Sequence, residues 1–243
     1  MIAIQVKSLT SIERMQLHSS HADAPSHTNH RSQKIVQSVS RMPIWTMQFR
    51  RAHSKKSVDV QERKRAMSKL ISEEYRKLNQ QLHKKRADYG SRKRLDMYDQ
   101  VRSLMASHEC QTVLDYGCGK ATMSKFIDGV TNYDPCIKEY SAPATPHDLI
   151  VCADVLEHIE PESLDHVLAD IINNAKKAIY LVIATRADST KTLPDGRNPH
   201  LIVKPGSWWL RKIKSLLPSW KVSASIDPSK GEVKLKCLNV SSF

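Results

Sequence analysis

From residue 113 onward, short apolar runs alternate with segments whose apolar residues recur every three or four positions. The most apolar run, AIYLVIAT at 178–185, has the nearly uninterrupted aliphatic character of a strand buried on both faces of a parallel sheet. Strands that alternate with helices predict a doubly wound α/β sheet. We expect strands at 112–117, 130–134, 148–156, 178–185, 220–227 and 231–238, and helices at 120–127, 161–177 and 206–217.

The N-terminal part of the chain has a different pattern. Residues 1–57 show no sustained period and are rich in Ser and His, which predicts a disordered or targeting tail. Between 58 and about 83, apolar residues recur at helical spacing among many charges, and a second helical face follows at 95–105. We therefore expect a tail at 1–57, a basic helical extension at 58–108 and an α/β domain at 109–243.

The charge of the chain is concentrated near this extension. The chain has 38 Lys and Arg against 25 Asp and Glu, a net charge of +13, and sixteen of the basic residues lie between Arg50 and Arg94 with five acidic ones. Such a stretch attracts phosphate backbones or anionic membranes, or it is a solvated helix face or arm. Nucleic acid bound through residues 50–94 is one partner that the sequence allows.

Cysteines and hydropathy indicate the compartment. The five cysteines form no CxxC pair, which predicts reduced thiols rather than disulfides or a zinc site. No run approaches the ~20 apolar residues that a membrane span needs, and residues 1–16 lack the apolar core of a secretion signal. We expect a cytoplasmic protein without a membrane span.

A glycine-rich turn ends the first expected strand, in the sequence VLDYGCGK. Ligands bind at the carboxyl ends of strands in such sheets, and Gly117 and Gly119 lack the Cβ atoms that would keep a ligand from the backbone. The next strand ends at Asp134, nineteen positions after Asp115. A carboxylate at about that distance suits the hydroxyls of a ribose. The sequence therefore predicts an adenosine-type cofactor.

Three motifs in order, DYGCG at 115–119, YDP at 133–135 and DVLEHIEP at 154–161, resemble the class I S-adenosylmethionine-dependent methyltransferases. With LPDGRNPHLI at 193–202, the chain also resembles a set of methyltransferase-like proteins from bacteriophages and bacteria, which implies the cytoplasm of a bacterium or of an infected host cell. The resemblance implies a Rossmann-like methyltransferase domain over 109–243. It implies a methionine-binding role for Asp115, Gly117 and Gly119, ribose binding by Asp134, and a place beside the transferred methyl group for the backbone at Ala153 and Asp154.

The resemblance implies transfer of a methyl group from S-adenosylmethionine to an oxygen or nitrogen acceptor. The alternative is a nucleic-acid-binding protein that keeps the scaffold without turnover. The chain departs from the family pattern in having Ala121 for a third glycine and in placing thirteen residues between Asp134 and Asp148, too few for another helix and strand. The sheet is therefore expected to be trimmed at that edge.

The DVLEH segment offers three interpretations. His158 is a general base oriented by Glu157 or Asp154; or Asp154, Glu157 and His158, with His200, bind Mg²⁺, Mn²⁺ or Zn²⁺ and lower the pKa of an acceptor hydroxyl; or Glu157 and His158 cap the following helix. The second resembles the metal site of small-RNA 2′-O-methyltransferases and ubiquinone-pathway O-methyltransferases.

Two further groups of side chains are candidates for binding. The long polar loop at 193–205 carries Arg197, Asn198 and His200, which are placed to meet an acceptor. Tyr75, Asn79 and His83 share one face of the first expected helix, where they either pack or cover the cofactor.

Overall fold

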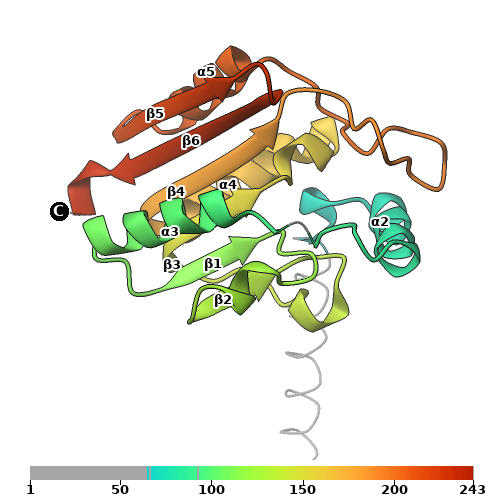
Figure 1. Ribbon diagram of the computed structural model, residues 1–243, viewed down its shortest axis with the longest axis horizontal. Helices are drawn as coiled ribbons and strands as arrows, with labels where there is room; N and C mark the ends of the chain where they lie inside the picture. Colours follow the sequence, from blue (N-terminus) through green and yellow to red (C-terminus); the bar gives the residue numbers. More distant parts are fainter. Residues whose placement is uncertain (1–64, 66, 92, 243) are drawn as a thin grey trace, which may run out of the picture.

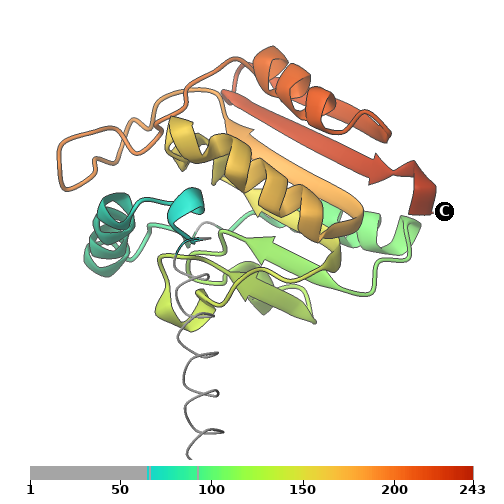
Figure 2. The same cartoon turned by 180° about the vertical axis from the view of Figure 1, so that it is seen from behind.

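The computed structural model describes residues 65, 67–91 and 93–242, so the predictions for residues 1–57 lie outside the described residues. In this part of the chain a six-stranded sheet has the order β2-β1-β3-β4-β6-β5 and carries helices on both faces (Figures 1 and 2). Strands β1 to β4 are parallel, and β6 is antiparallel to both of its neighbours, β4 and β5, which confirms the Rossmann-like α/β fold. The strands are β1 (Val113–Tyr116), β2 (Val130–Tyr133), β3 (His147–Ala153), β4 (Ala175–Ala184), β5 (Trp220–Asp227) and β6 (Glu232–Asn239).

Helices pack on the two faces of the sheet. On one face α3 (Leu95–Ser107) buries its apolar stripe, and on the other α4 (Leu164–Asn174) and α5 (Gly206–Leu216) do so. Alternate residues of β4 enter the two cores: Tyr180 and Val182 face α3, whereas Ile179 and Leu181 belong to the core of α4 and α5. This two-sided burial explains why the run at 178–185 shows no alternation of polar residues.

The predicted helix at 120–127 is wrong. The backbone stays left-handed at Gly117, Gly119 and Ala121, with φ of 81°, 52° and 52°. Because these dihedrals cannot continue a right-handed helix, the turn is longer than predicted. A three-residue 3-10 turn, η1 (Met123–Lys125), stands in place of the helix.

The single helix predicted from 58 to 83 is also wrong in the part that the structure describes. Met67–Leu70 are helical, the chain bends at Ile71, and α2 (Glu73–Lys85) begins afresh. Ser72 causes the new start, because its Oγ accepts a hydrogen bond of 3.1 Å from the Tyr75 amide as an N-cap. The same residue donates from its amide and hydroxyl to Glu160, at 2.8 and 2.6 Å, which ties α2 to the main domain.

The sheet is trimmed at the β2 edge, as predicted. β2 pairs with β1 alone, and the short turn η2 (Lys138–Tyr140) leads on to β3. The division of the chain at residue 109 stays a prediction, although α3, assigned to the extension, packs directly on the sheet. Among the described helices, none has the length and apolar character needed to cross a membrane.

Candidate active site

A cavity of about 340 Å³ lies at the carboxyl ends of the parallel strands. The segments that follow β1, β2, β3 and β4 contribute to its walls, and α2 and the chain at Tyr89–Gly90 complete them. The volume is within the usual range for small-molecule sites, and the position is the one expected for ligands of α/β sheets.

The turn after β1 is a cradle of bare backbone. The amides of Gly117 and Cys118 donate to the Tyr133 carbonyl at 2.7 and 3.0 Å, which fixes the turn against β2. A Cβ at Gly117 would overlap the Val155 side chain, and one at Gly119 would lie 2.5 Å from the Gly90 carbonyl oxygen. Since both glycines also have left-handed φ, no larger residue fits at either position without strain.

Two carboxyl groups lie beside this cradle. Asp134 accepts hydrogen bonds from the amides of Gly119 (3.0 Å) and Cys136 (2.8 Å). Asp115 lines the base of the cavity, where burial, and then the nearby Asp134, raise its pKa to about 7. Burial also raises the pKa of Asp134. The structure thus brings together all four residues predicted to bind the cofactor at β1 and β2, and their role stays a prediction.

Asp154 lies on the same cavity but is engaged by an arginine. Its φ is 55°, and its carboxylate accepts from Nη1 of Arg94 at 2.8 and 2.9 Å. The same buried guanidinium donates through Nη2 to Glu232. Sequence reasoning missed Arg94, and no local signal could have found it, because its partners are 60 and 138 residues away.

Glu157, His158 and His200 form a cluster whose candidate ligand atoms all lie within 4.8 Å of one another. Glu157 is fully buried; its Oε1 accepts from the Ala184 amide at 3.0 Å, and its Oε2 has no hydrogen-bond partner among the described residues. Asp154, which the sequence adds to this set, lies outside the cluster.

Both histidines of the cluster are oriented by backbone carbonyls. Nδ1 of His158 lies 2.9 Å from the Pro199 oxygen, and Nδ1 of His200 lies 2.6 Å from the Arg186 oxygen. Because a carbonyl can only accept, each neutral ring carries its proton on Nδ1 and keeps a lone pair on Nε2. Histidines that bind metals commonly donate their other ring N–H to a backbone carbonyl in this way. The interpretation of Glu157 and His158 as caps of the next helix is wrong, since their side chains bond Ala184 and Pro199 instead.

Burial changes the protonation of the cluster. Burial, and then the charge of Asp154, raise the pKa of Glu157 to about 8. Burial, and then the neighbouring His200, lower the pKa of His158 to about 4. His158 is therefore neutral at physiological pH, the form in which imidazole accepts a proton or binds a metal.

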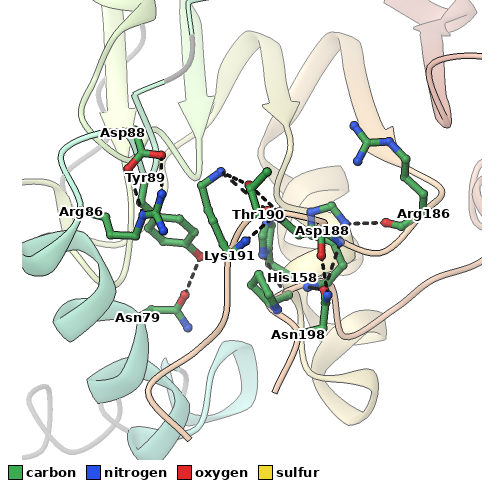
Figure 3. A network of polar contacts seen from close by, with 12 residues as sticks. Asn79, Arg86, Asp88, Tyr89, His158, Arg186, Asp188, Thr190, Lys191 and Asn198 are labelled. Carbon is green, nitrogen blue, oxygen red and sulfur yellow. Dashed lines mark hydrogen bonds and ion pairs between the residues drawn. The ribbon is translucent and has the colours of Figure 1, made fainter. Parts of the chain in front are cut away.

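One face of α2 covers the cavity. The Tyr75 hydroxyl donates to the His158 carbonyl oxygen at 2.7 Å. Asn79 donates to the Tyr75 carbonyl at 3.0 Å. It also accepts from the Tyr89 hydroxyl at 2.9 Å (Figure 3). His83 also lines the cavity, and its Nδ1 is buried without a partner among the described residues. The helix face formed by Tyr75, Asn79 and His83 thus lines the cavity and also packs against neighbouring segments.

The loop after β4, several of whose side chains are drawn in Figure 3, also lines the cavity, through Arg186, Asp188 and Lys191 among others. Asn198 braces the loop: its Nδ2 donates to the Asp188 carbonyl at 2.7 Å, and its Oδ1 accepts from the amides of Asp188 (3.2 Å) and His200 (2.9 Å). The guanidinium of Arg197 lies 5.9 Å from the centre of the Tyr75 ring. Of the three residues predicted to meet the acceptor, His200 alone lines the cavity.

These features define a Rossmann-like α/β protein with a ligand cavity at the carboxyl edge of its sheet. A family model described as "Methyltransferase domain" matches residues 61–225, more than half of the chain. The chain therefore belongs to this family, and the methyltransferase class predicted from the sequence is confirmed. A search of curated protein sequences gives no match.

Several solved structures have a similar fold. One, described as a DhpI–SAH complex, is 14% identical, covers 68% of this chain and 96% of its own, and has a TM-score of 0.47. The plantazolicin methyltransferase BpumL, in complex with a desmethyl analogue and SAH, is 14% identical, with coverage of 77% and 98% and a TM-score of 0.45. The methyltransferase domain of bacterial CtHen1 is 13% identical, with coverage of 58% and 97% and a TM-score of 0.44. These likenesses are too distant to argue from, so the family assignment rests on the family model.

Proposed function

We propose that this methyltransferase transfers a methyl group from S-adenosylmethionine to a hydroxyl oxygen of its acceptor, and that Glu157, His158 and His200 hold a divalent cation beside that hydroxyl. The observation that carries the proposal is the presence, in one cavity, of the glycine turn after β1 and of a cluster whose buried Glu157 has a carboxylate oxygen without a hydrogen-bond partner among the described residues. The cradle suits the methyl donor, and the cluster suits the activation of the acceptor.

The donor half of the cavity fits S-adenosylmethionine by its chemistry. Gly117 and Gly119 both line this half of the cavity, and Val155 and Gly90 pack where their side chains would stand. We assign the ribose hydroxyls to the Asp134 carboxyl, which two amides hold at the cavity, and the amino end of the methionine to Asp115, which also lines it. S-adenosylmethionine supplies an electrophilic methyl group on a sulfonium. These residues therefore need only align the methyl group with the acceptor, and in favourable cases such alignment lowers the activation free energy by ~7–11 kcal/mol.

The acceptor half fits a divalent cation. One carboxylate and two imidazoles form a ligand set that suits Mg²⁺, Mn²⁺ or Zn²⁺, and both imidazoles have Nε2 available. A cation bound there would lower the pKa of an acceptor hydroxyl. The carbonyls of Pro199 and Arg186 hold the Nδ1 protons, and Tyr75 holds the backbone of His158.

This arrangement favours an oxygen over a nitrogen acceptor. A neutral amine carries a nucleophilic lone pair, whereas a hydroxyl becomes a good nucleophile only as its proton is removed or weakened. An amine acceptor does not require a cluster of one buried carboxyl group and two histidines that are oriented by backbone carbonyls. If His158 instead acts alone as a general base, the acceptor is still a hydroxyl, and metal binding distinguishes the two roles.

The donor assignment is tested by isothermal titration of the full chain with S-adenosylmethionine and with its demethylated product. We expect micromolar binding of both, and a loss of at least about tenfold in Asp134→Ala, because charge-assisted hydrogen bonds contribute ~1.5–3 kcal/mol. Asp165→Ala, on the exposed side of α4, is the control and should bind as the parent does. Equal affinity in parent and Asp134→Ala would show that this carboxylate does not bind the ribose.

The cation site is tested by titration with Mn²⁺ alone. Because residues 1–57 also contain histidines, metal binding elsewhere in the chain is controlled for by comparing the parent chain, His200→Ala and the exposed control His166→Ala. We expect one binding event to disappear in His200→Ala and to remain in His166→Ala. If His200→Ala retains every event, the cluster does not bind the cation.

A further inference from the structure

A second hollow lies on the face of the sheet that carries α3, away from the cavity described above. It has a volume of about 450 Å³ and lies between α3 and strands β6 and β5. Figure 1 looks onto this face: α3 runs below β6, and no described helix lies in front of β5. We call it the α3–β6 groove; its walls are Asp96, Gln100, Tyr180, Ser223, Ala224, Ser225, Lys234 and Lys236.

A buried hydroxyl without a partner lines the groove. Tyr180 is 0% exposed, and its hydroxyl makes no hydrogen bond with any described residue. Burial raises its pKa, so this hydroxyl keeps its proton and acts as a donor. A buried polar group without a partner costs ~1–3 kcal/mol, so a ligand oxygen at this point would be stabilising.

The register of the strands places more donors beside this hydroxyl. Tyr180 is directly opposite Lys236, and Lys236 is directly opposite Ser223, so the three side chains share one face in a row across β4, β6 and β5. The next row on the same face contains Lys234 and Ser225. Hydroxyl and ammonium groups thus converge on the groove from three strands.

The charge of the groove is positive. Lys234 is paired with Asp96 at 2.8 Å and with Glu232 at 3.7 Å. Lys236 contacts the neutral amide oxygen of Gln100 at 2.6 Å, which orients the ammonium and leaves its charge uncompensated by that contact. Asp96 is the one acidic residue among the walls, and Lys234 already neutralises it.

We propose that the α3–β6 groove is a second binding site and takes a phosphate group, whose oxygens accept hydrogen bonds from Tyr180, Lys236 and Ser223. A tetrahedral oxyanion matches donors that approach from several directions. It also provides a negative charge to pair with the Lys236 ammonium, which its contact with Gln100 does not. The phosphate is either a free anion or part of a nucleic-acid backbone; the chemistry at the groove is the same.

The test uses the full chain and inorganic phosphate, titrated calorimetrically at constant ionic strength. Lys236→Met keeps the aliphatic stem and removes the charge, and Tyr180→Phe removes the hydroxyl alone. We expect the affinity for phosphate to fall at least about tenfold in Lys236→Met and by about threefold or more in Tyr180→Phe, since the first loses a charge-assisted bond and the second a neutral one. The control is Lys221→Met, an exposed lysine of β5 outside the groove, which should change the affinity less than about twofold.

A second arm identifies the source of the phosphate. A single-stranded oligonucleotide without terminal phosphates is titrated into the same variants. Weaker binding in Lys236→Met than in Lys221→Met assigns the groove to the nucleic-acid backbone, whereas a loss confined to inorganic phosphate assigns it to a free anion. The proposal is overturned if the parent chain binds neither probe, or if Lys236→Met and Tyr180→Phe bind both as the parent does. Tyr180→Phe carries the test alone if Lys236→Met does not fold.

Discussion

Replacing Asp115 by Asn should make the protein more stable, and the gain should grow with pH. The pKa of this carboxyl rises from an ordinary value of 3.8 to about 7, by burial first and then by Asp134. The folded state therefore holds a proton that the unfolded state has already released between about pH 4 and 7, so the free energy of unfolding falls across that window. About three pKa units correspond to roughly 4 kcal/mol. Since the group borders a cavity, we expect about 2–4 kcal/mol.

The assay is urea unfolding of the parent and Asp115→Asn at pH 4, 6 and 8, followed by circular dichroism. The difference in the free energy of unfolding between Asp115→Asn and the parent should be near zero at pH 4 and reach its full value at pH 8. Asp148→Asn is the matched control with the opposite sign: burial tends to raise the pKa of Asp148, but the amides of Gln111 and Thr112 hold it below its ordinary value. That variant should be less stable than the parent by a nearly constant amount at the three pH values, because the contribution of the Asp148 carboxylate develops below about pH 4.

Parallel stability curves for the parent and Asp115→Asn would refute the reasoning, because they would mean that the carboxyl is as well solvated in the folded protein as in the unfolded chain. Asp115→Asn should also bind S-adenosylmethionine more weakly than the parent. A residue that lowers stability and is needed for binding is the usual trade-off of a functional site.

Three further outcomes are expected. Gly119→Ala should destabilise the protein by more than about 2 kcal/mol in urea unfolding, because its Cβ would meet the backbone of Gly90; Gly129→Ala, which shares a left-handed φ but has open space, should cost about 1 kcal/mol. Arg94→Met removes the buried guanidinium that pairs with Asp154 and Glu232 and should cost about 1.5–3 kcal/mol at pH 7, and an unchanged melting temperature would contradict this. Tyr75→Phe should cost about 1 kcal/mol and weaken Mn²⁺ binding by the cluster; calorimetry with unaltered Mn²⁺ affinity would rule out a positioning role.

The strands and the three long helices after residue 94 could be predicted because their burial produces a local pattern. The run at 178–185 is apolar throughout since β4 is covered on both faces, and this holds whatever its partners are. The strand nevertheless begins earlier, at Ala175, because the polar Lys176 and Lys177 still fit at its exposed end. Composition cannot distinguish such a strand end from the end of the preceding helix.

The errors arose where contacts between distant segments outweighed local propensity. The helical pattern from 58 to 83 continues through Ser72, but Glu160, 88 positions later, binds that serine and breaks the helix there. Likewise the carboxylate of Asp154 appears free in the sequence and is engaged by Arg94 in the fold. The cluster of Glu157, His158 and His200 could be proposed from its motif, yet the carbonyls that orient its rings are backbone atoms, which leave no trace in residue types.

The two edges of the trimmed sheet also have a consequence for aggregation. An open sheet has two edges, and each can recruit a strand from another molecule. At one edge β2 offers four residues, too short a template for a stable intermolecular ladder. At the other, β5 is eight residues long and carries the exposed side chain of Ile226, but Pro218 and Pro228 flank it and Lys221 lies near its start. Protection against edge-to-edge aggregation therefore depends mainly on the composition of β5 and on the prolines that flank it.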